Sequence, residues 1–262
     1  MAEVTRIAYG THPDAFGDLS VPTAERTNPR PVVVLVHGGF WRQRYGLDLM
    51  APLVPSLIAR GFAVWNVEYR RVGGGGGFPM TTGDVAAAVD HLATIADDHR
   101  LDPEGVAVVG HSAGGHLATW VASRSQLSDG ATGAHPVVRP VLAISQAGVV
   151  DLVDAAEQRL GDGAAIDFMG ASPVQLPVEW HDSSPIELLP TAARVVLVHG
   201  ALDDTVPLRQ AERYLAAALA AGVEVEMIVD DDAGHFEHLD PEHFVWRVVL
   251  DELDRAFPAA GS

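Results

Sequence analysis

The sequence predicts an α/β protein with a mostly parallel central sheet and helices on both faces. Apolar runs rich in Val and Ile alternate with segments whose apolar residues recur at helical spacing. The runs are continuously apolar, as expected for strands that helices cover on both sides. At 262 residues the chain is near the upper size for one hydrophobic core. We therefore expect residues 1–262 to form a single domain.

The predicted elements follow one another regularly along the chain. Strands are expected at 31–36, 62–67, 106–109, 141–145, 194–198 and 224–229. Helices are expected at 47–60, 84–98, 117–122, 208–221 and 240–256. Gly61 takes the C-terminal cap of the first helix, and Asp240 with Pro241 supplies the N-cap and first position of the last. In such sheets, binding sites form beyond the carboxyl ends of the strands.

One long segment interrupts this alternation. Residues 151–190 lie between two predicted strands and include Ser184 and Glu187 at capping-box spacing, which predicts a short helix. Connections of this length commonly form lids or binding elements. We expect a lid or binding insertion here, within the single domain.

The composition argues against several classes of function. The formal net charge is −18, whereas nucleic acids and anionic membrane surfaces attract basic proteins. All 17 basic residues are arginine and there is no cysteine, so lysine Schiff bases, disulfides and thiolate metal sites are excluded. The first residues lack the features of a signal peptide, and no run of about 18 apolar residues occurs. We expect a cytoplasmic protein without nucleic-acid or membrane partners.

The most informative motif is G-x-S-x-G around Ser112. It lies between the apolar run 106–109 and the helical segment 117–122. A serine on a tight strand-to-helix turn projects its hydroxyl out of the backbone beside a helix N-terminus, and the flanking glycines Gly110 and Gly114 allow the turn to pack closely. Ser112 is therefore the candidate nucleophile.

A serine nucleophile needs a histidine base and a carboxylate that orients the histidine. His235 follows the last predicted strand, and Asp203 and Asp204 follow the strand before it. The chain order serine, acid, histidine is that of the α/β-hydrolase triad. Either aspartate fits this order from spacing alone.

The chain resembles the α/β-hydrolase superfamily over nearly its whole length. Enzymes of that superfamily often carry H-G-x-x-D-x-x-V-P after the penultimate strand, and this resemblance assigns the triad acid to Asp203. The segment His37–Trp41, His-Gly-Gly-Phe-Trp, resembles the H-G-G-x-W form of the esterase oxyanion loop. The resemblance assigns the oxyanion donors to the backbone amides of Gly39, Phe40 and Ala113.

These motifs predict a serine hydrolase that cleaves a small carboxylic ester through an acyl-enzyme, with no cofactor or metal. They look most like those of small bacterial carboxylesterases and arylformamidases. The alternative function is therefore an arylformamidase acting on N-formylkynurenine or a related aryl formamide. A non-catalytic ligand-binding relative is the third hypothesis. The expected partner is a small-molecule ester or amide, with a homodimer left open.

Other residues near the motifs allow two interpretations each. Four aromatic side chains could either line an acyl or aryl pocket or pack in the core, and the sequence favours neither role. They are Trp41, Phe168, Trp180 and Phe236. Several arginines follow the oxyanion loop and the next strand, and one of them is a candidate to bind a substrate carboxylate. The simpler expectation is that these arginines are solvated and pair with acidic residues on the surface. These arginines are Arg42, Arg44, Arg70 and Arg71. The histidines at 235, 238 and 243 lack the spacing of a metal site.

Overall fold

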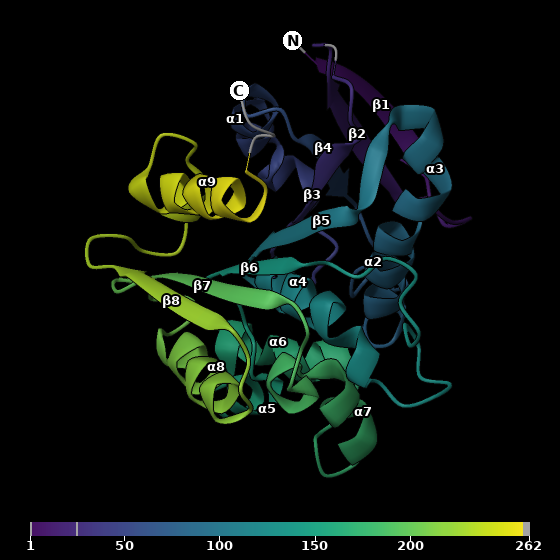
Figure 1. Cartoon of the computed structure of the whole chain (residues 1–262). Coiled ribbons are helices and arrows are strands. Elements are labelled where there is room, and N and C mark those ends of the chain that lie inside the picture. Colours follow the sequence, from purple (N-terminus) through teal and green to yellow (C-terminus); the bar gives the residue numbers. More distant parts are fainter. Residues whose placement is uncertain (1, 25, 259–262) are drawn as a thin grey trace.

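A sheet of eight strands forms the centre of the computed structural model, which describes residues 2–24 and 26–258 (Figure 1). The strand order is β1-β2-β4-β3-β5-β6-β7-β8. Neighbouring strands are parallel from β4 to β8, whereas β1 and β2 run antiparallel to their neighbours. The strands are β1 (Ala2–Ala8), β2 (Phe16–Pro22), β3 (Arg30–Val36), β4 (Ala63–Val67), β5 (Leu101–His111), β6 (Leu142–Gln146), β7 (Arg194–Gly200) and β8 (Val225–Asp230). The predicted fold class is confirmed.

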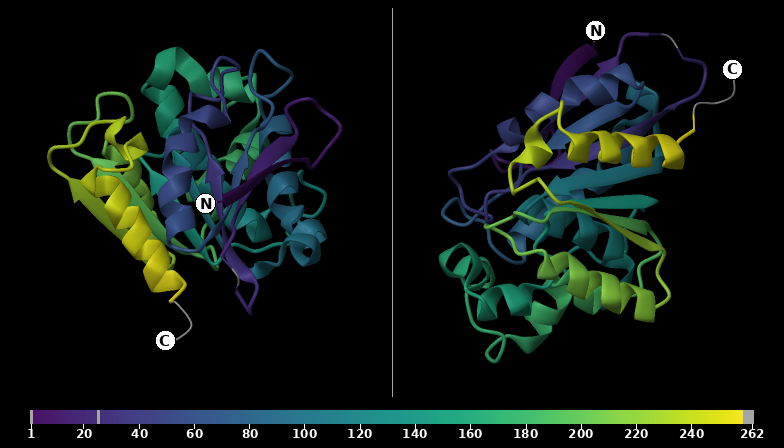
Figure 2. Two further views of the ribbon diagram at one scale, coloured as in Figure 1. Left: turned by 90° about the horizontal axis from the view of Figure 1, so that it is seen from above. Right: turned by 90° about the vertical axis from the view of Figure 1, so that its left-hand side faces the viewer.

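Helices cover both faces of the sheet. One face is covered by α1 (Val54–Ala59) and α9 (Phe244–Ala256). The opposite face is covered by α2 (Met80–Asp90), α3 (Leu92–His99), α4 (Ala113–Ser123) and α8 (Arg209–Ala220). Figure 2 shows α9 on one side of the strands, with α8 on the other. Among the described residues, no helix is long and apolar enough to cross a membrane.

The central strands are apolar throughout because successive side chains enter different cores. In β3, Val32, Val34 and Val36 pack toward α2 and α4. Val33 and Leu35 alternate with them and pack toward α1 and α9. All five side chains are fully buried. This two-sided burial is the physical reason for the continuous apolar runs.

Some predicted boundaries are wrong. The helix expected at 47–60 starts as two 3₁₀ turns, η1 (Leu47–Leu49) and η2 (Ala51–Leu53), because Pro52 has no amide to continue an α-helix. The last helix starts at Phe244, since Asp240 caps only a local turn by accepting from the amide of Glu242 at 2.9 Å. The strands β1 and β2 had no predicted counterpart.

The connection between β6 and β7 is mostly helical. It holds α5 (Leu152–Glu157), α6 (Leu160–Met169), α7 (Pro177–Ser183) and the 3₁₀ turn η4 (Pro185–Leu188). The predicted capping box does not form, because Ser184 Oγ instead accepts a hydrogen bond from the amide of Leu152 at 3.1 Å. Residues 161–163, at the start of α6, form a left-handed turn with φ between 57° and 84°. This turn faces the candidate active site described below.

Candidate active site

The nucleophile turn joins β5 to α4 at Ser112. Ser112 has φ of 57°, a conformation rare for a residue with a side chain, and its amide donates to Gln146 O on the neighbouring strand at 2.8 Å. Glycine is required at position 114, because a Cβ there would lie 2.0 Å from Val36 O. The close packing fixes the strained turn in place, with Ser112 only 2% exposed.

Asp203 and His235 meet at the carboxyl edge of the sheet. His235 Nδ1 lies 2.7 Å from Asp203 Oδ2. The other oxygen, Oδ1, accepts from the amides of Thr205 at 2.9 Å and Val206 at 2.8 Å. The carboxylate is fully buried, whereas Asp204 is exposed and accepts only from Thr205 Oγ1 among the described residues.

These contacts define how the histidine is protonated. Burial alone raises the pKa of Asp203, but the hydrogen bonds from His235 and the two backbone amides outweigh it and leave the pKa below its ordinary value. Asp203 is therefore an anion that only accepts hydrogen bonds. His235 Nδ1 must carry the proton that it donates, so neutral His235 has Nε2 free as a base.

Ser112 and His235 line the same cavity, whose volume is about 280 Å³. Fourteen of the described residues line it. They come from residues 39–49, the turn at Ser112, the start of α6, and the loops that follow β7 and β8. Its lining includes Gly39, Phe40, Tyr45, Gly161, Thr205 and Phe236. Within the described residues no hydrogen bond joins Ser112 Oγ to His235; in unliganded enzymes such bonds are often long and tighten on substrate binding.

The loop predicted to form the oxyanion hole has an unusual backbone. Gly39, Phe40 and Trp41 all have positive φ, at 109°, 51° and 55°. In the described part of the chain, the amides of Gly39, Phe40 and Ala113 donate to no acceptor. Ala113 is the first residue of α4, where the helix dipole is positive. The three amides are thus available to a negatively charged oxygen in the cavity.

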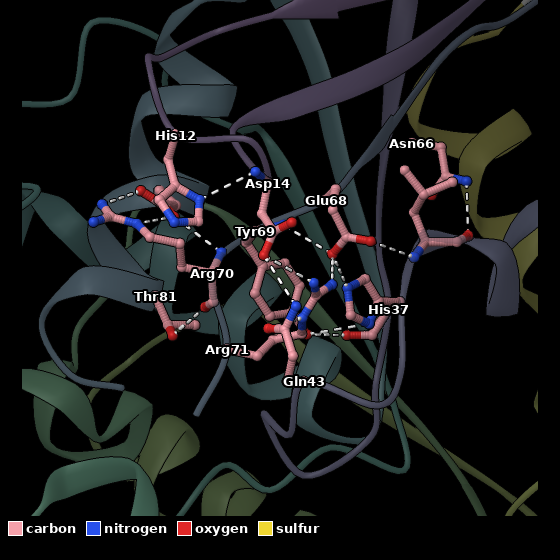
Figure 3. A network of polar contacts seen from close by, with 12 residues as sticks. His12, Asp14, His37, Gln43, Asn66, Glu68, Tyr69, Arg70, Arg71 and Thr81 are labelled. Atoms are coloured by element: carbon pink, nitrogen blue, oxygen red, sulfur yellow. Dashed lines mark hydrogen bonds and ion pairs between the residues drawn. The ribbon is translucent and has the colours of Figure 1, made fainter. Parts of the chain in front are cut away.

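A buried polar network holds His37, the first residue of this loop segment (Figure 3). The ring of His37 stacks on Tyr69 at 4.3 Å, and Tyr69 donates its hydroxyl to His37 O at 2.7 Å. His37 Nε2 lies 2.8 Å from Glu68 Oε1, and Glu68 also pairs with Arg71. Burial lowers the pKa of His37 to about 3, so the ring is neutral at ordinary pH. The two ring nitrogens face Glu68 Oε1 and Gly38 O, each at 2.8 Å, and a neutral ring donates to one of these two acceptors. His37 therefore braces the loop as a neutral ring.

Two histidines have contacts that the sequence did not predict. His111 Nε2 lies 2.8 Å from His235 O, so its N–H donates to that carbonyl and fixes the backbone of His235. His116, on α4, accepts from Trp41 Nε1 at 3.2 Å and donates from Nε2 to Ser183 O at 2.8 Å. His116 thereby joins the oxyanion loop, the nucleophile helix and α7. Their positions beside the glycines of the motif were the only available signal.

Three of the four aromatic residues proposed for the pocket belong to the core instead. Trp41, Phe168 and Trp180 are each 1% exposed and do not line the cavity. Trp41 stacks on Phe168 at 4.6 Å, and the indole of Trp180 donates to Ala171 O at 3.1 Å. Phe236 does line the cavity and is 67% exposed.

The histidines at 235, 238 and 243 do not gather around a common point. His243 caps α9 by accepting from the amide of Val245. His238 is fully buried, and its burial lowers its pKa well below the ordinary value. Within 2–24 and 26–258 there is no group of three His, Cys, Asp or Glu side chains arranged to hold a metal ion.

A larger hollow, of about 680 Å³, lies elsewhere on the protein. It is bounded by β1, β2, η1, η2 and α1, and its wall is mostly apolar. None of the predicted site residues lines it. Chemistry rather than size therefore identifies the smaller cavity at Ser112 as the candidate active site.

A model of the BD-FAE family matches residues 18–219, which is most of the chain. The chain belongs to the BD-FAE family. BD-FAE is an α/β-hydrolase esterase family, so the resemblance to α/β-hydrolases is confirmed. The matched range contains Ser112 and Asp203, whereas His235 lies beyond it.

Several curated relatives of this BD-FAE chain carry esterase names. A probable isoprenylcysteine alpha-carbonyl methylesterase of Oryza sativa subsp. japonica is 28% identical over 248 residues, which cover 87% of this chain and 56% of the relative. Esterase LipC of Mycobacterium tuberculosis is 27% identical over 252 residues, covering 90% and 60%. The BD-FAE chain thus spans less than two thirds of the length of these relatives.

Solved structures share the fold of this BD-FAE chain. A truncated carbohydrate esterase from gut microbiota has a TM-score of 0.82 at 18% identity, and covers 98% of this chain and 96% of its own. The carboxylesterase Cest-2923 from Lactobacillus plantarum has a TM-score of 0.79 at 17% identity and covers both chains completely. At these identities the comparison establishes the α/β-hydrolase fold.

Proposed function

We propose that the protein is a carboxylesterase that hydrolyses small carboxylic esters through an acyl-enzyme on Ser112. The observation that carries this proposal is the buried hydrogen bond of 2.7 Å between Asp203 and His235, next to a cavity that both His235 and Ser112 line. The esterase names of the relatives and the BD-FAE family support the same reaction class.

The proposed reaction has two halves. In the first, Ser112 Oγ attacks the ester carbonyl while His235 Nε2 takes the serine proton, and His235 then gives that proton to the departing alcohol. In the second, His235 takes a proton from the water that attacks the acyl carbon. It then returns this proton to Ser112 Oγ as the acid leaves. Asp203 stabilises the imidazolium that forms in each half, because the aspartate is an anion fixed against Nδ1.

The backbone amides supply the other half of the catalysis. The carbonyl oxygen becomes negative in each tetrahedral intermediate, and amides aimed at it contribute about 3–4 kcal/mol each. The amides of Gly39, Phe40 and Ala113 are the proposed donors, because none of them has an acceptor in the described chain.

We further propose that residues 151–190 act as a lid element within one domain. Gly161 and Asp162, at the left-handed turn of α6, line the cavity beside Phe40. Arg42 holds this turn by donating to Gly161 O at 2.5 Å. A Cβ at Gly161 would lie 2.7 Å from the ring of Phe40, so the turn lies directly on that ring.

A substrate comparison tests the proposed function. Turnover of p-nitrophenyl acetate, p-nitrophenyl butyrate and N-formylkynurenine is measured side by side, with Ser112→Ala as the blank. We expect the wild-type protein to hydrolyse the acetate and butyrate esters. Faster turnover of N-formylkynurenine would favour the arylformamidase alternative, and a wild-type rate equal to that of the alanine variant on all three would contradict both.

A further inference from the structure

The arginines near the candidate site differ in whether their guanidinium groups already pair with acceptors in the protein. Arg70 makes paired hydrogen bonds to Asp84 at 2.6 Å and 2.8 Å. Arg71 pairs with Glu68 beneath the oxyanion loop. Both cations are neutralised inside the protein, and neither residue lines the cavity at Ser112. Neither is therefore available to a substrate.

Arg42 and Arg44 do line the cavity. Arg42 is held by Gly161 O at 2.5 Å and has Asp167 at 3.8 Å. Arg44 is exposed, and no carboxylate or carbonyl of residues 2–24 and 26–258 forms an ion pair or hydrogen bond with it. Of the four arginines near the site, Arg44 alone has a guanidinium group without a protein acceptor in the described structure.

A neighbouring ring holds Arg44 close to the oxyanion loop. The guanidinium carbon of Arg44 lies 4.7 Å from the ring centroid of Tyr45, within the range of a cation–π contact. Tyr45 in turn lies against Gly39, because a Cβ at Gly39 would be 2.4–2.5 Å from three atoms of the tyrosine. The guanidinium group of Arg44 therefore lies near the backbone of Gly39, which is one of the proposed oxyanion donors.

Acidic side chains are abundant in this protein, yet none pairs with Arg44 within the described residues. The chain has 35 acidic residues against 17 arginines, so acidic partners outnumber the basic groups by about two to one. Asp162 also lines the cavity, but it forms no ion pair with Arg44. Arg44 thus lines the cavity as an exposed cation without an acceptor among the described residues, and such a group can pair with an anionic ligand.

We infer that the substrate is a small ester that carries a carboxylate, and that Arg44 binds this carboxylate. This inference rests on the proposed function and adds the substrate class. The planar fork of a guanidinium group matches a carboxylate with two parallel hydrogen bonds, which a lysine cannot reproduce. The carboxylate replaces the partner that the protein does not supply, while the ester carbonyl lies at Ser112.

Two pairs of esters of matched size test the inference. In one pair the leaving group carries the charge: 4-acetoxybenzoate against methyl 4-acetoxybenzoate. In the other the acyl group carries it: the p-nitrophenyl monoester of glutaric acid against p-nitrophenyl pentanoate. The measured quantity is the ratio of kcat/KM, anionic over neutral, in each pair. We expect a ratio of about 10 or more in one pair, the scale of a hydrogen bond to a charged group.

Variants assign that ratio to the guanidinium group. Arg44→Gln should reduce the ratio to about one, and Arg44→Lys should leave an intermediate ratio because it keeps the charge without the fork. Arg139→Gln is the matched control, since Arg139 is also exposed and unpaired among the described residues but does not line the cavity. It removes the same charge and should leave the ratio unchanged.

The outcomes separate the inference from the proposed function. If neutral esters are hydrolysed with a ratio of one or less in both pairs, or if Arg44→Gln keeps the wild-type ratio, the inference is wrong and the esterase assignment stands. An equal fall with Arg139→Gln would also overturn it, because net charge would then be the cause. If none of the four esters is hydrolysed, the proposed function fails and the inference fails with it.

Discussion

Replacing Asp203 with asparagine tests the candidate triad most directly. The carboxylate has two distinct oxygens: Oδ1 accepts from the amides of Thr205 and Val206, and Oδ2 accepts from His235 Nδ1. In Asp203→Asn the carboxamide oxygen must keep the position of Oδ1, where two amides need an acceptor. Its NH₂ group then faces His235 and donates to Nδ1. The proton of neutral His235 is forced onto Nε2, where a base is needed.

The size of the effect follows from the same contacts. To recover the productive tautomer the carboxamide must flip, which leaves two buried amides without an acceptor at about 1–3 kcal/mol each. The total of about 2–6 kcal/mol corresponds to a loss in kcat of roughly 30-fold to 10⁴-fold, at about 1.36 kcal/mol per factor of ten. The same substitution in a serine protease triad costs about 10⁴. We expect the loss to lie in the upper part of this range.

The assay is kcat for p-nitrophenyl acetate, with the thermal unfolding midpoint measured on the same samples. The fold should persist, because the two backbone hydrogen bonds to Oδ1 are kept. Asp204→Asn is the matched control, and its exposed side chain should change kcat by less than about tenfold. A folded Asp203→Asn enzyme with more than a tenth of wild-type kcat, or a larger loss in Asp204→Asn, would refute this assignment of the acid.

Four further predictions concern other parts of the site. Ser112→Ala should lower kcat by roughly 10⁴–10⁶, and a fluorophosphonate probe followed by mass spectrometry should label Ser112; a label on another residue would contradict the assignment. Wild-type kcat/KM should fall for p-nitrophenyl esters with more than about four acyl carbons, by about 1–3 kcal/mol of transition-state binding per carbon. Phe40→Ala should extend hydrolysis to longer esters, because it keeps the backbone amide and removes the ring. A wild-type optimum at octanoate would disprove a small acyl pocket. His116→Phe should lower the free energy of unfolding in urea by about 2–5 kcal/mol, because Trp41 Nε1 and Ser183 O lose their buried partners; a change below about 1 kcal/mol would mean that these bonds contribute little. Prolonged EDTA treatment should leave kcat unchanged, and a loss that zinc restores would revive a metal site.

Much of the sheet was predictable because strands that are buried on both faces have continuous runs of apolar residues. The strands β3 to β8 have apolar runs, and their predicted ranges overlap the observed ones. The strand β1 leaves no such mark, since it lies at the sheet edge with mostly exposed side chains. Asp240 and Pro241 have the residue types of a helix start, yet they form a turn, because such pairs favour both structures.

The meeting of Ser112, Asp203 and His235 in one region was predictable for a different reason. Each follows a parallel strand, and the carboxyl ends of parallel strands share one edge of the sheet. The direction of a ring is not encoded in this way. Trp41 follows Phe40 directly, yet its side chain enters the core and meets His116, while Phe40 lines the cavity. Both residues have a left-handed backbone, at φ of 51° and 55°, which the spacing of the motif does not reveal.

The turn at 161–163 contacts the segment whose amides are the proposed oxyanion donors. Arg42 bonds to Gly161 O, and the ring of Phe40 fills the space where a side chain at position 161 would extend. A protein engineer therefore cannot exchange this insertion for that of another hydrolase as an independent module. A graft that places any larger residue at position 161 would push on the ring of Phe40. A change intended to alter access to the pocket would then also shift one of the proposed oxyanion donors. Libraries that diversify the insertion should keep residues 159–163 fixed and vary the exposed positions of α7 instead.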